Sequence, residues 1–247
     1  MLFFDENNDI ILSYGHLKVN EKERGREMKK EILLFDLDGT LFNTKPGIIN
    51  CFKYALDYYG IITDENFDFN RVIGPPLHKS FQNYFGFDEK KAVEAAAKYR
   101  ERYKDEGIFE CEPYEGMKEA LEALKSNGAR IGVATSKPEI FAERIIEKFG
   151  FSPYFDFVTG SMLDNSRSTK SEVITEALRL FGALQDRDKV IMIGDREHDI
   201  IGAKETGLES MGVEYGFAKE GELNKAGADY IAKDVEEMKK QLLTMLL

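Results

Sequence analysis

The sequence lacks several features that would place it in a specialised class of protein. No apolar run reaches the length of about 18 residues that a membrane-spanning helix needs, so we expect no contact with a membrane. The only two cysteines, Cys51 and Cys111, do not have the spacing of metal ligands. We expect reduced thiols in the core of a cytoplasmic protein. No internal repeat with a period of 20 to 50 residues is visible, which argues against a repeat protein.

Positive charge is also scarce. Lys and Arg number 34 against 45 Asp and Glu, which gives a formal net charge of −11. A nucleic acid needs a basic surface that neutralises its phosphates, so this balance argues against such a partner. Hydrophobic residues make up 43% of the 247 positions and charged residues 32%, which is typical of a globular protein with a sizeable core. Such a protein can still bind a small anion if the site supplies its own cation.

The first 27 residues differ in pattern from the rest of the chain. Two apolar runs flank Asn7-Asn8-Asp9 and predict a hairpin, and the start of the chain turns acidic too early for a secretion signal. The polar run "NEKERGRE" follows, and we hypothesise that the natural start is Met28, which would make residues 1–27 non-native. Residues 46–112 then place Tyr, Phe and Ala at helical spacing, and this pattern predicts a block of helices.

Helix and strand alternate after Pro113, behind a first strand predicted at 32–35. The pattern predicts a helix at 115–128, a strand at 129–135, a helix at 137–150 with Pro138 in its first turn, a strand at 155–161, a helix at 170–182, a strand at 189–195, a short helix at 199–207, and strands at 209–216 and 228–232 before a terminal helix. Alternation of this kind predicts βαβ units. The expected fold class is α/β, a doubly wound parallel sheet built from residues 28–45 and 113–247, with 46–112 inserted after the first strand.

Polar residues stand where these predicted strands end. They are Asp36 and Asp38 after the first strand, Thr135 and Ser136 at the end of the second, Asp195 at the end of the strand at 189–195, and Lys170 at the start of the helix that follows the strand at 155–161. Ligands bind beyond the carboxyl ends of parallel strands, so we expect these residues to converge. Each has an ordinary structural explanation when taken alone, such as Asp199 as a helix N-cap. Their joint placement favours a ligand site.

The chemistry of these residue types indicates phosphoryl transfer. Crowded carboxylates repel one another unless a cation joins them, and Mg²⁺ is a hard cation that takes oxygen ligands beside a phosphate. A lysine and a hydroxyl group suit the oxygens of a phosphoryl group. An aspartate can attack phosphorus and form an aspartyl-phosphate. A second carboxylate two residues further on, as Asp38 follows Asp36, can protonate the leaving oxygen and then deprotonate a water.

The motifs "DLDGTLFNT", "VATSKP", Lys170 and "IGDREHD" resemble, in this order, the four signature motifs of the haloacid dehalogenase-like (HAD) hydrolase superfamily. The resemblance covers residues 30 to about 235 and is strongest to phosphoglycolate phosphatase-like and 5'-nucleotidase-like members with a helical cap. It implies a Rossmann-like core, with residues 46–112 as a mobile cap that closes on the substrate.

The resemblance also implies a role for each motif residue. Asp36 would be the nucleophile and Asp38 the general acid and base. Thr135 would bind the transferring phosphoryl group, and Lys170 would screen its charge. The implied metal is Mg²⁺, held by Asp36, Asp195 and the backbone carbonyl of Asp38, with Asp199 ligating it or orienting a bound water. The expected phosphate-binding residues are Asp36, Gly39, Thr135, Ser136 and Lys170.

Two departures from the family pattern leave the substrate open. Asn43 stands where many relatives have an aspartate, and "KSEV" stands where many phosphoglycolate phosphatases have K-P-x-P, while "GSMLDNSRSTKSEVI" resembles nucleotidases of the family. We expect a phosphatase for a small phosphorylated metabolite, of the phosphoglycolate or nucleoside monophosphate type. The alternatives are a pyrophosphatase, which "IGPPL" resembles, and a sugar-phosphate mutase, which shares Asp38. From a different class, a phosphoaccepting regulator that does not hydrolyse its phosphate also combines an acidic cluster, a threonine and a lysine.

The segment "RVIGPPLHKSF" carries a prediction about the cap. Gly74-Pro75-Pro76 predicts a stiff turn, which presents His78 and Lys79 just before a helix. We predict that these two side chains recognise the part of the substrate beyond the phosphate, because a closing cap must contact that part. The alternative is that both are ordinary surface residues.

Overall fold

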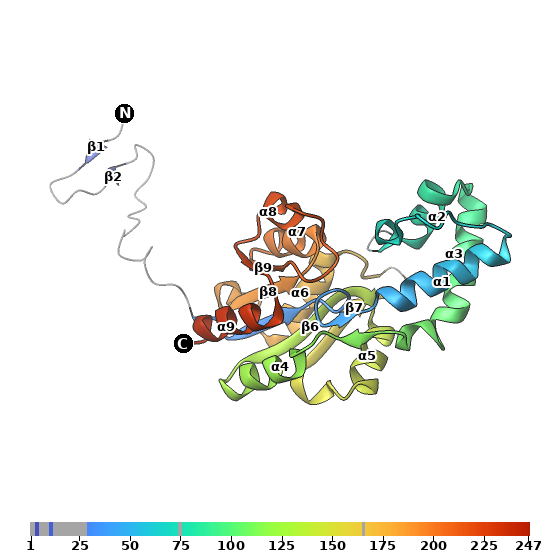
Figure 1. Ribbon diagram of the computed structural model, residues 1–247. Coiled ribbons are helices and arrows are strands. Elements are labelled where there is room, and N and C mark those ends of the chain that lie inside the picture. The colour runs from blue at the N-terminus through green and yellow to red at the C-terminus, as the bar shows by residue number, and fades with distance from the viewer. Residues whose placement is uncertain (1–2, 5–9, 12–28, 74–75, 165) are drawn as a thin grey trace.

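The computed structural model describes residues 3–4, 10–11, 29–73, 76–164 and 166–247 (Figure 1). In the N-terminal extension, β1 (Phe3–Phe4) pairs antiparallel with β2 (Ile10–Ile11), which agrees with the predicted hairpin. The predicted turn at residues 7–9 lies outside the described residues. The hypothesis that the natural start is Met28 stays a prediction.

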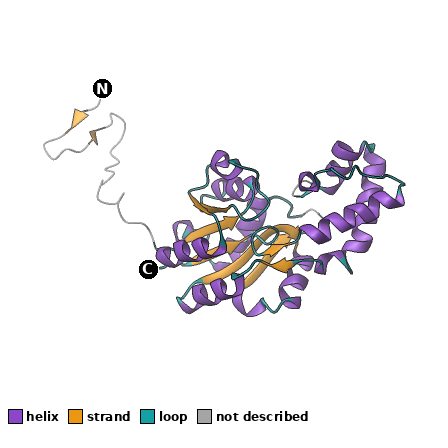
Figure 2. Cartoon of the chain, in the orientation of Figure 1, coloured by secondary structure: helices purple, strands orange, loops and turns teal. Residues whose placement is uncertain are grey.

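A six-stranded parallel sheet forms the centre of the fold, and helices cover both of its faces (Figure 2). The strand order is β10-β9-β8-β3-β6-β7, and every neighbouring pair in this sheet is parallel. This arrangement confirms the predicted α/β fold class. The strands are β3 (Ile32–Phe35), β6 (Arg130–Pro138), β7 (Phe157–Ser161), β8 (Val190–Gly194), β9 (Glu209–Val213) and β10 (Tyr230–Ala232).

Successive residues of β3 face opposite sides of the sheet, as the pleat requires. Leu33 and Phe35 pack in the larger core cluster, with side chains of α4, α5 and α9. Ile32 and Leu34 pack in the smaller cluster, with side chains of α6 and α7. Both faces are covered, which explains why "ILLF" is apolar throughout. The core helices are α4 (Met117–Ser126), α5 (Glu139–Lys148), α6 (Lys170–Phe181), α7 (Glu197–Glu205), α8 (Glu222–Ala226) and α9 (Val235–Met245).

The cap is built from three helices, α1 (Lys45–Tyr58), α2 (Leu77–Phe85) and α3 (Glu89–Tyr103), which lie together on the right of Figure 1. They share an aromatic core of their own, in which the Phe52 ring lies 4.9 Å from the Phe81 ring and 5.1 Å from the Tyr99 ring. Short 3-10 turns at Phe69–Val72 and Gly107–Phe109 complete the insertion.

An antiparallel ribbon joins the two crossings between core and cap. β4 (Phe42–Asn43) leaves the core and pairs with β5 (Glu112–Pro113), which returns to it. The sequence analysis found no strong strand here, because two-residue strands are too short to show a period. The ribbon ties both ends of the insertion together next to the site.

Two details of the predicted elements are corrected. β6 continues through Pro138 and α5 begins at Glu139, so Pro138 precedes the helix as its N-cap residue instead of occupying its first turn. The backbone at Pro138 is extended, with φ −54° and ψ 130°, which suits the end of a strand. Helix α8 was not predicted. Further 3-10 turns occur at Ser152–Tyr154 and Arg187–Lys189.

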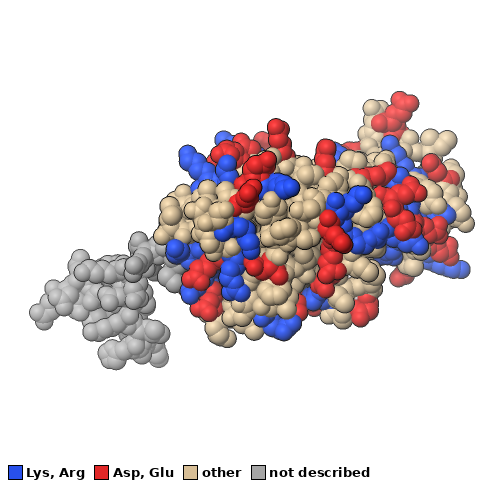
Figure 3. Space-filling model, turned by 90° about the horizontal axis from the view of Figure 1, so that it is seen from below, with Lys and Arg blue, Asp and Glu red and all other residues tan. Residues whose placement is uncertain are grey.

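Three expectations drawn from composition can be compared with the model. Cys51 and Cys111 both carry free thiols, as expected. Among the described residues, none of the helices combines the length and the apolar character needed to cross a membrane. On the face seen in Figure 3, the described Lys and Arg side chains are interspersed with Asp and Glu, so this face offers no continuous basic stripe to a nucleic acid.

Candidate active site

The register of the central strands brings the predicted site residues to one edge of the sheet. Phe35 of β3 pairs with Val133 of β6 and with Ile193 of β8, so the three strands reach this edge together. Asp36 directly follows β3 and Asp195 directly follows β8. These strand ends and the cap form the two walls of a cleft of about 780 Å³.

Three buried carboxyl groups and one lysine cluster at the base of the cleft, where Asp36, Asp199 and Lys170 are among its lining residues and Asp195 lies beneath them. One oxygen of each of Asp36, Asp195 and Asp199 lies within 4.8 Å of the others. Lys170 Nζ lies 2.6 Å from Asp36 Oδ1 and 2.7 Å from Asp199 Oδ1, and it donates to the Ala134 carbonyl at 3.0 Å. With all three carboxyl groups ionised, the single ammonium leaves two negative charges uncompensated. A divalent cation would balance them.

The electrostatics of the cluster also fit a cation. Burial raises the pKa of Asp36 to about 6, although the ion pair with Lys170 opposes this rise. Burial, followed by repulsion from Asp199 and Asp36, raises the pKa of Asp195 well above its ordinary value. Burial alone would lower the pKa of Lys170, but its two carboxylate partners raise it, so the lysine stays charged. Oxygen donors that are buried and mutually repelling suit a hard ion such as Mg²⁺.

The loop after β3 is pressed against Asp195. Gly39 has a φ of +83°, and its N–H donates to the Phe42 carbonyl at 2.8 Å. A Cβ at this position would lie 2.1 Å from Asp195 Oδ2. The same oxygen accepts a 2.7 Å hydrogen bond from the backbone N–H of Phe217. Only glycine therefore allows the loop with Asp36 and Asp38 to approach Asp195 so closely.

A second buried lysine, Lys137, was missed in the sequence analysis. Its Nζ lies 2.8 Å from Asp38 Oδ2 and donates to the Tyr103 hydroxyl at 2.5 Å. Burial lowers the pKa of Lys137, but Asp38 and Tyr103 raise it by more. The backbone N–H of Lys137 donates to Thr135 Oγ1 at 3.2 Å. The motif "VATSKP" contains this lysine, and its place two residues after Thr135 was the available signal.

The cap wall of the cleft is mainly apolar. Among the predicted pair, His78 lines the cleft, whereas Lys79 is exposed and is not one of the described lining residues. The predicted stiff turn falls partly on residues 74–75, which lie outside the described residues. Arg100, which was not predicted, also lines the cleft, and within the described part of the chain no carboxylate pairs with it. The apolar cap residues on the wall are Ile48, Val72, Ile73, Pro76, Leu77, Tyr99 and Tyr103.

Arg196 connects the loop between Asp195 and Asp199 to the cap. Its Nη1 donates to the Ile73 carbonyl at 2.9 Å, and its Nε donates to Glu222 Oε1 at 2.7 Å. Its backbone N–H donates to Asp199 Oδ2 at 3.0 Å. The sequence analysis missed this residue, although it stands between Asp195 and Asp199 in "GDREHD". One side chain thus links the cap, the core and the acidic cluster.

Of the core residues predicted for phosphate binding, all except Gly39 are among the described lining residues of this cleft. Thr135 is buried and Ser136 is exposed, and both line the cleft beside Asp36 and Lys170. The Ser136 carbonyl accepts a 2.8 Å hydrogen bond from Ser161 Oγ, which joins the end of β6 to the end of β7. The structure therefore brings these predicted residues together, and their contacts with a phosphate stay a prediction.

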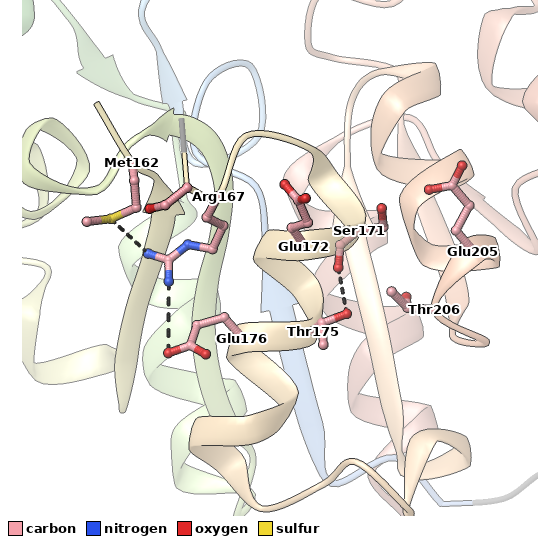
Figure 4. Close-up of a pocket in the computed structure, with 9 residues that line it drawn as sticks. Met162, Arg167, Ser171, Glu172, Thr175, Glu176, Glu205 and Thr206 are labelled. Carbon is pink, nitrogen blue, oxygen red and sulfur yellow. Dashed lines mark hydrogen bonds and ion pairs between the residues drawn. The ribbon is translucent and has the colours of Figure 1, made fainter. Parts of the chain in front are cut away.

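A smaller hollow of about 580 Å³ lies beside α6 (Figure 4). Its cation, Arg167, points toward Met162 Sδ at 3.4 Å and Glu176 Oε1 at 3.9 Å, and it also pairs with Glu139. Thr175 on the same helix donates its hydroxyl to the Ser171 carbonyl at 2.7 Å. The charge of Arg167 is thus compensated, and we assign no chemistry to this hollow.

Comparison with known proteins identifies the family. Residues 33–213 match the model of the haloacid dehalogenase-like hydrolases. A 5'-nucleotidase of Pseudomonas aeruginosa is 39% identical over 210 residues, which cover 85% of this chain and 94% of that protein. Tyrosine-protein kinase PtkA of Mycobacterium tuberculosis is 32% identical over 214 residues, 86% of this chain and 72% of that protein. A solved structure of a putative phosphatase from Clostridium difficile is 49% identical, with a TM-score of 0.80, and covers 87% of this chain and 99% of that one.

The fold and the site define an α/β enzyme whose acidic cluster lies at the carboxyl ends of parallel strands, beneath an inserted helical cap. The chain belongs to the haloacid dehalogenase-like hydrolase family. This finding confirms the resemblance drawn from the four motifs and the expectation of an enzyme. The comparisons also support the general function of a phosphatase of this family.

Proposed function

We propose that the protein is a Mg²⁺-dependent phosphatase that hydrolyses a small phosphorylated metabolite through an aspartyl-phosphate intermediate. The observation that carries this proposal is the contact of Lys170 with both Asp36 and Asp199, with Asp195 completing the buried cluster at the strand ends. Family membership supports the same chemistry.

In the first step a carboxylate oxygen of Asp36 attacks phosphorus. The bond to Asp36 forms, the bond to the leaving oxygen breaks, and Asp38 donates its proton to that oxygen. Lys170 compensates negative charge on Asp36 and on the phosphoryl oxygens, and the Thr135 hydroxyl donates to one of those oxygens. In the second step water attacks the same phosphorus atom. Asp38 accepts a proton from the water, and Asp36 leaves as a carboxylate while phosphate is released.

The acidic cluster fits a divalent cation, as its charge and burial indicate. In this proposal Asp36, Asp195 and the backbone carbonyl of Asp38 hold Mg²⁺, while Asp199 ligates it or orients a bound water. When bound, the ion neutralises charge on the transferring phosphoryl group. Lys170 fixes the orientation of Asp36 whether or not the ion is present, because it holds one oxygen of that carboxyl group at 2.6 Å.

The cleft favours a leaving group of nucleoside size. Its volume of about 780 Å³ lies within the range of about 300 to 1,000 Å³ found for pockets that hold drug-sized ligands. Glycolate would leave most of this space to water. A pyrophosphate would bring further negative charge to a cleft whose lysines and Arg196 already pair with carboxylates. These features support a nucleoside monophosphate over phosphoglycolate and pyrophosphate.

A substrate panel tests the proposal with the full chain. Nucleoside 5'-monophosphates, 2-phosphoglycolate, pyrophosphate, a hexose phosphate and 4-nitrophenyl phosphate are each incubated with Mg²⁺ or with EDTA, and released phosphate is measured. We expect fastest release from a nucleoside monophosphate and none in EDTA. Isomerisation of the hexose phosphate without release of phosphate would indicate a sugar-phosphate mutase. A long-lived acyl-phosphate on the protein without turnover would indicate a phosphoaccepting regulator. Full activity in excess chelator would contradict the proposed dependence on Mg²⁺.

A further inference from the structure

We infer that Lys137 is a positioning residue, which holds the Asp38 carboxyl group in the orientation needed for proton transfer, and that Tyr103 of the cap completes this arrangement. The inference rests on the proposed function, because it assigns Asp38 the proton transfers of that reaction. None of the four family motifs gives a role to Lys137 or to Tyr103.

The geometry around Asp38 distinguishes its two oxygens. Lys137 Nζ lies 2.8 Å from Oδ2, whereas Oδ1 is buried and has no hydrogen-bond partner in the described structure. The ion pair therefore fixes the rotation of the carboxyl group. A proton on Oδ1 leaves Oδ2 able to accept from Lys137, so the contact persists in both protonation states of Asp38.

Lys137 is itself held from two sides. Its side chain is 5% exposed, and its backbone N–H donates to Thr135 Oγ1, so one residue orders both the phosphate-binding hydroxyl and the proton-transfer carboxyl group. Tyr103 accepts the second hydrogen bond of Nζ at 2.5 Å. Its ring stacks on Tyr99 at 5.4 Å and meets the edge of Phe141, on core helix α5, at 5.6 Å. The lysine is therefore anchored by both core and cap.

The hydrogen bond between Lys137 and Tyr103 couples the position of the cap to the orientation of the Asp38 carboxyl group. Tyr103 is the last residue of α3, so its hydroxyl reaches Lys137 only while the cap covers the cleft as it does here. In the first step the proton passes from the Asp38 carboxyl group to the leaving oxygen as the bond from that oxygen to phosphorus breaks. In the second step a proton of the attacking water returns to this carboxyl group as the new bond to phosphorus forms. A carboxyl group free to rotate would be correctly oriented for these transfers in only a fraction of encounters.

Leaving-group dependence separates this role from a merely structural one. 4-Nitrophenolate is a weakly basic anion that leaves readily without a proton. Phenolate is more basic, so its departure depends more strongly on a proton from the general acid. We measure kcat and KM for 4-nitrophenyl phosphate and phenyl phosphate at saturating Mg²⁺ in Lys137→Met, Lys137→Arg and Tyr103→Phe. General acid catalysis is worth about 10²- to 10⁴-fold, so a misplaced acid forfeits part of that. We expect Lys137→Met to lower kcat for phenyl phosphate about tenfold more than for 4-nitrophenyl phosphate, with KM little changed.

The other two variants refine the test. Tyr103→Phe removes one hydroxyl from a ring whose packing remains, and we expect a change in the same direction but smaller. Lys137→Arg keeps the charge and the donors, and we expect it to restore part of the kcat for phenyl phosphate. Tyr103→Phe also decides the matter alone if Lys137→Met does not fold. In that case, equal changes for the two esters in Tyr103→Phe would overturn the inference.

Arg144→Met is the matched control. Arg144 Nη1 donates to the Lys104 carbonyl at 2.6 Å, so it is a bond between core and cap that does not involve Asp38. We expect equal changes for both esters in this variant. Equal losses in Lys137→Met would make Lys137 a structural residue and overturn the inference. Failure of the unmodified protein to hydrolyse either ester would contradict the proposed function instead, so the two failures are distinguishable.

Discussion

The two walls of the cleft differ in how their polar groups are held. On the core wall, Lys170 contacts two carboxylates and Lys137 contacts one, each within 2.8 Å, and the Phe217 N–H holds Asp195. On the cap wall most side chains are apolar, and Arg100 has no carboxylate partner among the described residues. Groups that are already held by ion pairs and hydrogen bonds suit the phosphoryl transfer, which is the same for every substrate, because they need little reorganisation in the transition state. An unpaired group on the cap wall suits recognition of the part of the substrate that varies.

The comparison also explains why the walls touch at so few polar points. Arg196 reaches the Ile73 carbonyl, and Lys137 reaches the Tyr103 hydroxyl. Both core residues lie within two positions of a predicted site residue, Asp195 or Thr135. These two polar contacts between cap and core therefore lie beside the residues proposed to carry the chemistry, whereas the bond from Arg144 to the Lys104 carbonyl lies away from them, on α5.

The largest expected effect comes from the nucleophile on the core wall. Asp36→Asn keeps the shape of the side chain but removes the attacking carboxylate. We expect kcat for 4-nitrophenyl phosphate to fall by about 10⁴-fold or more, since loss of a nucleophile removes most of the catalysis of the unit in which it acts. Mass spectrometry of the acid-quenched protein should show phosphate attached to the unmodified chain and none on the variant. Near-normal turnover in Asp36→Asn would rule out the covalent mechanism.

Gly39→Ala should damage the core wall without replacing a charged residue. The new Cβ would lie 2.1 Å from Asp195 Oδ2, and an L-residue at φ +83° costs about 1 to 2 kcal/mol. We expect a loss of kcat of at least about 100-fold and a weaker apparent affinity for Mg²⁺. Unchanged Mg²⁺ affinity, measured by titrating activity, would show that the loop does not set the position of Asp195. Gly182→Ala is the matched control, because Gly182 has φ +69° but nothing within 4 Å of its Cβ.

Most of the core wall was predictable from sequence, although Lys137 and Arg196 were missed, and the reason is local. Asp36 and Asp195 each follow a short apolar strand directly, Thr135 lies near the end of β6, and parallel strands must bring such residues to one edge. Lys170 was found through its motif position, and the contact with Asp36 bears out the expected convergence. No long-range geometry beyond the parallel sheet was needed for these residues.

The cap wall was not predictable in the same way. The contact between Tyr103 and Lys137 spans 34 positions and depends on how α3 docks over the sheet, which no local pattern encodes. Arg100 stands in a stretch rich in charged residues, and the sequence pattern there is the same for an arginine that faces the cleft as for one that faces solvent. Lys79 was predicted to contact the substrate because it follows a turn that contains two prolines. In the structure it is not among the described lining residues of the cleft.

A further prediction concerns the charge of the core wall without metal. The pKa of Asp36, about 6, exceeds its ordinary value of 3.8, so the folded metal-free protein binds this proton more tightly than the unfolded chain. Its contribution to stability is therefore present below about pH 4 and is lost as pH rises through about 6. Asp195 acts in the same direction. Mg²⁺ replaces these protons, so it should stabilise the protein more at pH 7.5 than at pH 5.

Thermal unfolding with and without Mg²⁺ measures this difference. At 100 times its Kd a ligand adds about 2.7 kcal/mol, which corresponds to a rise in Tm of roughly 5 to 10 °C for a protein of this size. We expect a rise of that order at pH 7.5 and a much smaller one at pH 5. Asp195→Asn should abolish the rise at both values. An equal rise at both pH values would show that the ion binds elsewhere.

The smallest expected effect lies on the cap wall, at Arg100. Binding energy from the part of a substrate remote from the phosphate orients the phosphate, so its loss lowers rate as well as affinity. A single hydrogen bond to a charged group is worth about 1.5 to 3 kcal/mol. For a nucleoside 5'-monophosphate that is turned over, we expect Arg100→Ala to lower kcat/KM by about tenfold or more. For 4-nitrophenyl phosphate, whose leaving group is smaller, we expect less than about twofold.

Two lysine variants show whether an effect of Arg100→Ala comes from the position of the side chain or only from the loss of a positive charge on the cap. Lys90→Ala removes an exposed cation from the same helix, α3, at a residue outside the described lining of the cleft, and should leave both substrates unaffected. Lys79→Ala tests the prediction made from sequence. If it selectively lowers kcat/KM for the nucleotide while Arg100→Ala does not, the turn before α2 reads the leaving group and Arg100 does not. If only Arg100→Ala is selective, recognition comes from α3, the same helix whose last residue holds Lys137 against Asp38.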